Sequence, residues 1–472
     1  MKSSIKVLYT IAASVLVFAG CRKNLDLEPT DIFSAGEAVR DVNDLRSGYY
    51  TAQARNNREN TMFFAAVASD EILIGANNGG QGQFENRWQY SQDVTTGGGA
   101  TAGWSSYYSM LQQTNTFLLV ADTISKRNAS ETGVVNQIKG QLLTLRAMAH
   151  FELLERFGQN VGTYNANSLA VPVVTKPLDQ FASPSRNTAG EVMAQIETDL
   201  RDAWTLLPSA NTAGSFSDTS ISRLTVTAFH ARVALHKRAW QQAIDSATRV
   251  INSNVRPLTN DARLFAQIWE DSTATTEVLY RIKRSGTGVG EIWTTAGGGV
   301  QFSPSNKLRA SFTANDIRVA PYFGSLTGTT VRKFFQSALG GRRVDVKYMR
   351  TAEMYLIRAE AYAELGDAAN IALGAADLNF LRGRRIPGYT DATFTAAQDL
   401  IDAVMTERFK ELCFEGFRFF DLKRRGLSIE RAAGDFTSAN WQSLPAGNFR
   451  FILPIPVGEL QANRNIRQNP GY

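Results

Sequence analysis

The sequence predicts a mainly α-helical fold, in which a single domain of tetratricopeptide-type helical hairpins carries long irregular insertions and short strands. Several segments place apolar residues at helical spacing, i, i+3, i+4 and i+7. Two alanine-rich stretches each divide into two helices and a turn, as in repeat units of about 34 residues. Glycine-rich stretches, which disfavour a regular helix, separate these segments. With 472 residues, 43% of them hydrophobic, the chain can bury a large core.

The N-terminus has the pattern of a lipoprotein leader. Lys2 and Lys6 form a basic start, and Val7 to Gly20 is mostly apolar but too short to span a bilayer, which takes about 20 residues. Small residues precede Cys21, as in a lipobox. We therefore expect residues 1–20 to be a cleaved signal peptide and Cys21 to carry the lipid. A plain secretory signal with an incidental cysteine is the alternative.

The segment after the leader predicts how the folded body is attached. Residues 21–35 are polar, include a proline and show no clear period, so they are expected to form a tether. Residues 36–472 are expected to form the helical domain. No second apolar run reaches spanning length, so the mature protein is expected to be anchored to a membrane without crossing it.

Charge and composition argue against several classes of function. The formal net charge is +6, two of the basic residues lie in the leader, and the remaining excess is scattered, so no nucleic-acid partner is expected. The densest basic cluster, Arg382 to Arg385, falls at a predicted helix end, where cations are favoured. Cys413 lies in an apolar stripe and is expected to be a buried small hydrophobe. Three scattered histidines leave little material for histidine catalysis or a metal site.

Two long helices and a capped helix are predicted in the N-terminal half. Residues 103–120 and 134–157 are apolar at helical spacing, and the second segment ends before a glycine. A third helix is expected over 188–207, because Thr188 and Glu191 form a capping box and a proline follows.

The alanine-rich hairpins follow, with a different kind of segment between them. Residues 222–251 and 346–381 each predict a pair of closely packed helices. The composition of 277–283 is typical of a strand, and 285–306 is too rich in glycine for a regular helix.

The stretch 406–426 combines an apolar stripe with many charges. Glu411, Glu415 and Arg418 follow one another at i, i+4 and i, i+3, as side chains on one helical side do, and Gly426 is a predicted C-cap. Two carboxylates four residues apart allow a glycosidase interpretation, with one acid and one base or nucleophile. We favour a structural ion-pair network, because buried charges must be paired.

Motifs at both ends of the chain are similar to those of the SusD/RagB family. The C-terminal motifs are Glu407-Arg408, Glu411-Leu412, Phe414-Glu415-Gly416, Arg418, Asp421-Leu422, Arg424, Leu453-Pro454-Ile455-Pro456 and Gln468-Asn469-Pro470-Gly471-Tyr472. The N-terminal motifs are Trp104, Tyr108, Asn115, Leu145-Arg146-Ala147 and Phe157-Gly158. The resemblance covers nearly the whole mature chain. It is to a family of nutrient-capturing outer-membrane lipoproteins of Bacteroidetes.

The resemblance implies a SusD-like domain that binds a glycan and delivers it to a SusC-like TonB-dependent transporter, without catalysis. It implies an outer-membrane location, with the lipid-anchored protein facing the cell exterior. It also implies a shallow ligand site built from insertions between helical units, one of them near the N-terminus. No cofactor is expected, and the sequence leaves open whether a calcium ion is bound.

The loop 75–103 has the composition of a glycan-binding surface. Sugar rings lie on aromatic faces, and amides and arginines bond the hydroxyl groups. Amide side chains and an arginine surround Phe84 and two further rings in this loop, and we expect the rings to be partly exposed. The candidate ligand-binding residues are Asn78, Arg87, Trp88 and Tyr90, with Trp293 from the second glycine-rich insertion.

Three alternatives stay open at this stage. Trp88 could pack on the body, with the loop facing the transporter. The ligand could be a peptide, bound by a lipoprotein of the same uptake type. The protein could instead be a glycoside hydrolase that uses Glu411 and Glu415 or other carboxylates.

Overall fold

The structure is a computed structural model that describes residues 39–209, 214–271, 276–284, 289–295, 297–335 and 340–472, with the side chains of 94–100 excepted. The predicted signal peptide, Cys21 and the tether lie outside the described residues. The described chain is mainly helical and carries three short antiparallel strand pairs, which confirms the predicted fold class.

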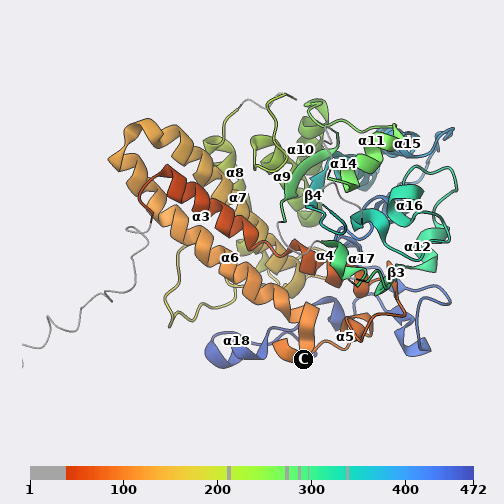
Figure 1. The fold of residues 1–472 in the computed structure, drawn as a ribbon, viewed down its shortest axis with the longest axis horizontal. Coiled ribbons are helices and arrows are strands. Elements are labelled where there is room, and N and C mark those ends of the chain that lie inside the picture. Colours follow the sequence, from red (N-terminus) through yellow and green to blue (C-terminus); the bar gives the residue numbers. More distant parts are fainter. Residues whose placement is uncertain (1–38, 210–213, 272–275, 285–288, 296, 336–339) are drawn as a thin grey trace, which may run out of the picture.

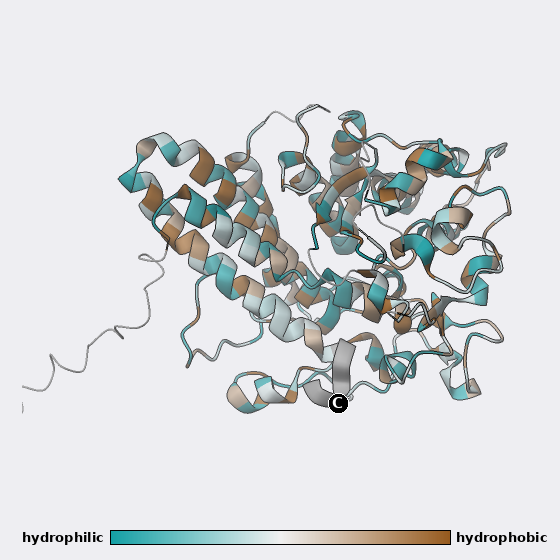
Figure 2. Cartoon of the chain, in the orientation of Figure 1, coloured by the Kyte–Doolittle hydropathy of each residue, from teal (hydrophilic) through white to brown (hydrophobic). Residues whose placement is uncertain are grey.

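Long helices form one end of the molecule. Helix α3 (Val42–Ala54) lies against α6 (Val94–Arg127) and α7 (Thr132–Phe157), and the three run side by side in Figure 1. Hydrophilic and hydrophobic residues alternate along these helices in Figure 2, as expected for helices with one buried face. Helix α8 (Ala189–Leu206) packs on α7 and begins with the predicted capping box of Thr188 and Glu191.

Helix α6 begins earlier than predicted. We expected a loop over residues 75–103, but the helix starts at Val94, so the glycine-rich end of that stretch forms its first turns. A glycine costs a helix only about 1 kcal/mol relative to alanine. Packing of the rest of this 34-residue helix against α3 and α7 offsets that cost.

The two predicted helical hairpins are present. The first pairs α9 (Arg223–Lys237) with α10 (Trp240–Asn252), and the second pairs α14 (Thr351–Leu365) with α15 (Ala368–Arg385). Helices α10 and α14 also contact each other, so the two hairpins stack although long insertions separate them in the sequence.

The strands join segments that are far apart in the sequence. The pairs are β1 (Ile72–Ile74) with β3 (Phe302–Pro304), β2 (Val278–Ile282) with β4 (Val346–Arg350), and β5 (Ile429–Glu430) with β6 (Ser443–Leu444). Strand β2 was predicted, but β4 was expected to begin the second hairpin. Its residues include Val346 and Tyr348, which favour strands, and they pair with β2 before the helix starts.

The remaining elements are short apart from α16. They are α4 (Arg58–Val67), α5 (Gln83–Asn86), α11 (Ala262–Trp269), α12 (Asn306–Ala310), α13 (Val319–Phe323), α16 (Ala397–Glu411), α17 (Arg418–Arg425) and α18 (Val457–Ala462), with 3-10 turns at Ala129–Glu131, Val289–Ile292, Arg332–Phe334, Ala439–Trp441 and Phe449–Phe451. The stretch 406–426 is therefore two helices, because Phe414 (φ 64°) and Gly416 (φ 88°) take left-handed conformations between them. Gly426 caps α17 with φ 65°, as predicted.

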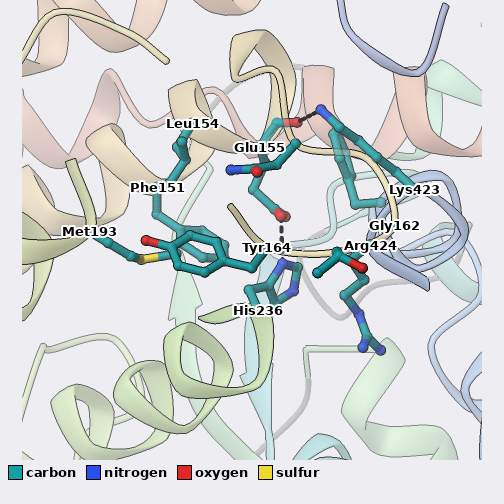
Figure 3. A pocket seen from close by; sticks show the side chains of 12 residues that line it. Phe151, Leu154, Glu155, Gly162, Tyr164, Met193, His236, Lys423 and Arg424 are labelled. Atoms are coloured by element: carbon teal, nitrogen blue, oxygen red, sulfur yellow. Dashed lines mark hydrogen bonds and ion pairs between the residues drawn. The ribbon is translucent and has the colours of Figure 1, made fainter. Parts of the chain in front are cut away.

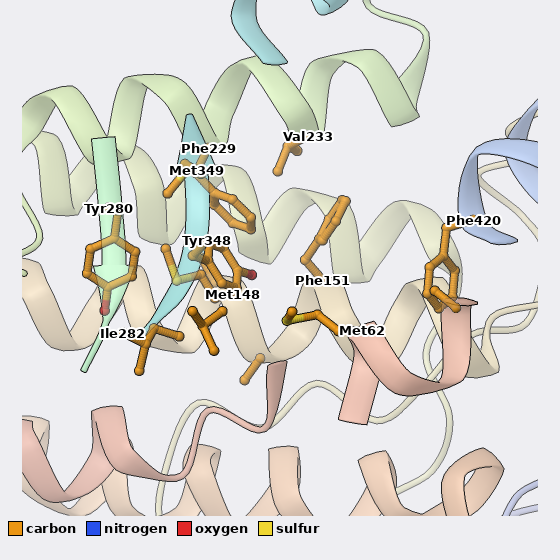
Figure 4. Packing of buried hydrophobic residues seen from close by; sticks show 14 of the residues in the cluster. Met62, Met148, Phe151, Phe229, Val233, Tyr280, Ile282, Tyr348, Met349 and Phe420 are labelled. Carbon is orange, nitrogen blue, oxygen red and sulfur yellow. The ribbon is translucent and has the colours of Figure 1, made fainter. Parts of the chain in front are cut away.

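The main core lies where the β2–β4 pair meets the helices. Figure 4 shows Tyr348 of β4 with Phe229 of α9 and with Met148 and Phe151 of α7. These residues are buried. Within the described part of the chain, every helix falls short of the length or the apolar character that crossing a membrane requires.

Candidate functional site

The structure brings the two glycine-rich insertions together. Ile72 pairs with Pro304 and Ile74 with Phe302 in the β1–β3 ladder. Beyond the strands, the backbone N–H of Gly75 donates to the Gln301 carbonyl at 2.8 Å, and that of Asn77 to Val300 at 3.0 Å. The two candidate loops, although distant in the sequence, are thus neighbours at one edge of the molecule.

Asn78 holds the turn that follows β1. Its side chain is 4% exposed, donates to the Gln301 carbonyl at 3.3 Å and accepts from the Gly80 N–H at 3.1 Å. Gly79 and Gly80 follow at positive φ, a conformation that favours glycine. Asn78 therefore ties the first loop to the second.

The expectation that Trp88 and Tyr90 are exposed is wrong. Trp88 is 2% exposed, its indole N–H donates to the Ala68 carbonyl at 2.7 Å, and the Arg431 guanidinium lies 4.3 Å from the ring centre. Tyr90 is buried against Phe64, with ring centres 5.7 Å apart. Burial raises the pKa of the Tyr90 hydroxyl well above its ordinary value. Burying a large apolar ring against the folded body stabilises the protein more than leaving the ring exposed to water.

Trp293 is a core residue in this structure. It is fully buried, and its ring centre lies 5.4 Å from that of Phe414 and 6.2 Å from that of Phe334. In this arrangement the indole faces of Trp88 and Trp293 pack against protein, so both residues support the loops. Whether any of the candidate residues contacts a ligand stays a prediction.

Phe84 is the exposed ring of the first loop. It lies in α5 and is 51% exposed. Several polar side chains of the same loop are also exposed or half-buried. We define the loop surface as Asn77, Gln81, Phe84, Arg87 and Gln89 together with Gly297 and Gly298 of the second insertion. It offers one ring face, three amides that both donate and accept, and one guanidinium.

Glu411 and Glu415 form the ion-pair network that the sequence predicted. Glu411 accepts from Arg350 at 2.8 Å and from Arg318 and Arg385 at 3.0 Å each. Glu415 accepts from Arg350 at 2.7 Å and from Lys333 at 2.7 Å.

The electrostatics of this network follow from burial and pairing. Burial alone would raise the pKa of Glu411, but the three arginines hold it well below its ordinary value. Both carboxylates are buried away from solvent. Neither is placed as the proton donor or base of an open site.

Arg418 takes a different partner from the one that helical spacing suggested. It forms a bidentate salt bridge with Asp70, with N–O distances of 2.7 and 2.8 Å. The break in the helix before α17 turns Arg418 away from Glu415. Lys307 also reaches Asp70, at 2.7 Å. Burial alone would raise the pKa of Asp70, but Arg418 and Lys307 lower it to about 2.

His150 and Cys413 are structural residues. The Val174 N–H donates to His150 Nε2 at 3.1 Å, and His150 Nδ1 lies 3.1 Å from the Arg146 carbonyl. Burial lowers the pKa of His150 to about 3, so its ring is neutral. Cys413 is free and buried, as predicted, and burial raises the pKa of its thiol. Among the residues that the structure describes, no three His, Cys, Asp or Glu side chains gather as a metal site.

One small pocket lies where α7, α9 and α17 meet (Figure 3). Its polar contacts are His236 Nδ1 to Glu155 at 2.6 Å, and Lys423 Nζ to the Glu155 carbonyl at 2.5 Å. Burial lowers the pKa of Lys423 to about 8. The cavity of about 50 Å³ has room for one or two waters, so it is too small for a sugar ring.

Two models of known protein families match the chain. A model described as the SusD family matches residues 256–472. A second, described as starch-binding associating with outer membrane, matches residues 28–235. The chain belongs to the SusD family. The match of both halves agrees with the motifs at both ends of the sequence.

The similarity to other SusD-family proteins covers nearly the whole chain. SusD-like protein P2 of Formosa agariphila is 25% identical over 99% of this chain and 100% of its own length. The crystal structure of a SusD superfamily protein from Bacteroides thetaiotaomicron superposes with a TM-score of 0.77 at 22% identity, covering 91% of this chain and 100% of that one. A structure described as a laminarin binding SusD-like protein has a TM-score of 0.67 at 21% identity, covering 91% and 99%. These structures share the SusD fold.

Proposed function

We propose that this SusD-family protein is a lipid-anchored protein of the outer membrane that captures a glycan at the cell surface and passes it to a SusC-like TonB-dependent transporter. The observation that carries the glycan assignment is the loop surface, where an exposed ring and several amides project from two insertions that hydrogen-bond to each other. The leader that ends at Cys21 supports the anchor. The laminarin binding relative supports the class of ligand.

Capture in this proposal needs no bond breaking. The half-exposed ring of Phe84 stacks on the C–H face of a sugar, while Asn77, Gln81 and Arg87 bond its hydroxyl groups. The buried Trp88 and Asn78 hold the loop in place through their bonds to backbone carbonyls. Because the two loops are already hydrogen-bonded to each other without ligand, they lose little conformational entropy on binding.

Calorimetry with a panel of neutral oligosaccharides tests the assignment. We expect binding by the native protein and a loss of about tenfold or more with Phe84→Ala, since a stacked ring contributes roughly 1–2 kcal/mol. Phe380→Ala is the matched control, because Phe380 is a similarly exposed ring (41%) on α15, outside the loop surface. Binding that survives Phe84→Ala unchanged overturns the site, and no binding to any glycan overturns the function.

Two further readouts address the alternatives. Release of reducing ends by the native protein would establish a hydrolase in place of a binding protein. Binding of peptides with no response to glycans would establish a peptide-capturing member of the same uptake type.

A further inference from the structure

A groove lies on the side of the first helical hairpin, away from the loop surface. It is formed by α8, α9 and α10, and its volume is about 380 Å³, which is within the range of small-ligand sites. In Figure 1 these helices occupy the upper part of the view, whereas α5 of the loop surface lies at the bottom. The groove residues that bear on its chemistry are Glu197, Arg201, Trp204, His230 and Arg249.

Trp204 gives this groove an aromatic wall. Its side chain is 44% exposed, the most of any tryptophan among the described residues. The Arg223 guanidinium covers one side of the ring, 4.3 Å from its centre, and donates to the Thr205 carbonyl at 3.4 Å. The indole is thereby held in one orientation, and its other face is the one available to a ligand.

The charge of the groove is positive. Lys237 Nζ donates to both carboxylate oxygens of Glu197, at 2.7 and 2.9 Å. Within the part of the chain that the structure describes, Arg249 contacts only a backbone carbonyl, at 3.4 Å, and has no carboxylate partner. Arg201 pairs only with its exposed neighbour Asp202 at 3.2 Å, an interaction worth little in water. The Arg249 guanidinium therefore lacks a carboxylate partner, and the exposed Arg201–Asp202 pair is weak enough for a bound anion to compete with it.

The floor of the groove is polar but uncharged. His230 Nδ1 lies 2.9 Å from the buried Ser246 hydroxyl. Burial lowers the pKa of His230, which favours the neutral ring. A neutral imidazole and the nearby Thr227 provide donors and acceptors for hydroxyl groups without adding charge.

We propose that this groove binds an anionic sugar residue, with its ring on the free face of Trp204 and its carboxylate or sulfate group on Arg249 and Arg201. An aromatic wall selects a ring with a flat C–H face, and guanidinium groups select planar or multi-oxygen anions. A glycuronate and a sulfated sugar share this chemistry. The site uses none of the residues of the loop surface and does not depend on the function proposed for it.

The test is calorimetry with three short oligosaccharides, maltotriose, sulfated maltotriose and trigalacturonate, at about 0.15 M salt, where long-range charge attraction is screened beyond about 8 Å. We expect one or both anionic sugars to bind, and maltotriose to bind at least tenfold more weakly at this groove. Trp204→Ala should weaken anionic binding about tenfold or more, and Arg249→Gln about fivefold or more. The preferred anion distinguishes a carboxylate site from a sulfate site.

Two control variants separate the groove from general effects. Phe380→Ala removes a ring that also lies under a guanidinium, that of Arg384 at 4.8 Å, but that lies outside the groove. Phe84→Ala removes the ring of the loop surface. Anionic binding should be unchanged in both.

A readout in the native protein covers the case in which Trp204→Ala folds poorly. Bound anionic sugar should protect the exposed indole from acrylamide quenching, and the protection should be absent in the folded variant Trp204→Phe. Affinity for maltotriose equal to that for the better-binding anionic sugar, binding unaffected by Arg249→Gln and Trp204→Phe, or no binding of either anion each overturns the proposal.

Discussion

Glu411 connects three arginines that come from three different parts of the chain. Arg318 precedes α13, Arg350 ends β4 and Arg385 ends α15, and all three side chains are buried with the carboxylate. The cost of burying an unpaired charge correctly indicated an ion-pair network, but helical spacing suggested Arg418 beside Glu415, and Arg418 pairs with Asp70 instead. A buried charge is tolerated only with such partners, because water no longer solvates it.

Removing the charge of Glu411 should be strongly destabilising. Glu411→Gln leaves three buried guanidinium groups short of negative charge, so we expect a loss of about 3–5 kcal/mol in the free energy of unfolding. Urea unfolding followed by circular dichroism measures it. Asp202→Asn is the control, because the Asp202–Arg201 pair is exposed and should contribute less than about 1 kcal/mol. A loss below about 1 kcal/mol for Glu411→Gln would contradict the network.

His150 should make stability fall as the medium becomes acidic. Its folded-state pKa is about 3, below the ordinary value of 6.5, so the unfolded chain binds a proton first as pH falls. The stabilisation by the neutral ring is complete above about pH 6.5 and is lost progressively toward pH 3, at up to about 1.4 kcal/mol per pH unit.

The measurement is the unfolding free energy of the native protein and of His150→Gln between pH 7 and about pH 5. The variant should have lower stability at pH 7 but a shallower decline, since it lacks this titrating group. Parallel curves for the two proteins would show that His150 is not the source of the slope.

The second helical hairpin shows how small residues set the distance between elements. A Cβ at Gly374 of α15 would lie 2.8 Å from the Ala359 carbonyl of α14 and 3.0 Å from Leu400. Nothing lies within 4 Å of a Cβ at Gly383 in the same helix. The alanine-rich pattern predicted this close approach, and the structure identifies where it is closest.

Two substitutions in α15 should therefore have opposite signs. Gly383→Ala should stabilise the protein by up to about 1 kcal/mol, through the higher helix propensity of alanine. Gly374→Ala should destabilise it by about 1–3 kcal/mol, because the added methyl group meets backbone atoms that cannot move aside easily. Thermal unfolding of both variants compares them directly, and stabilisation by Gly374→Ala would contradict the packing.

At the scale of the whole molecule, long-range pairing builds the loop surface. The β1–β3 ladder and the bonds from Gly75 and Asn77 join two insertions that come from opposite halves of the sequence. Arg431, from a third region, covers Trp88 and donates to the Asn86 carbonyl at 2.8 Å. The loop surface therefore depends on the complete fold.

The membrane attachment proposed for the molecule should depend on one cysteine. Cys21→Ala should remove lipid labelling and shift the protein from the outer-membrane fraction to the soluble fraction. Cys413→Ala is the control, because that thiol is buried in the folded domain and should leave attachment unchanged. Metabolic labelling with palmitate and cell fractionation measure both. Membrane retention of Cys21→Ala would favour a plain secretory signal and another mode of attachment.

The sequence by itself determined the helical class, the two hairpins, the capping box at Thr188 and the burial of Cys413. These depend on periodicity and local hydrogen bonds, which short segments carry within themselves. It also identified the two insertions and, through its motifs, the family.

Only the tertiary structure decided which rings are exposed, which charges meet and which segments form strands. Sequence reasoning selected Trp88 and Trp293, yet both are buried and the half-exposed ring is Phe84. Nor did it single out Trp204, although an exposed tryptophan on the polar side of a helix was a signal. β4 became a strand because β2 lies beside it. Exposure, ion pairing and strand pairing depend on neighbours that are remote in the chain, so local pattern cannot determine them.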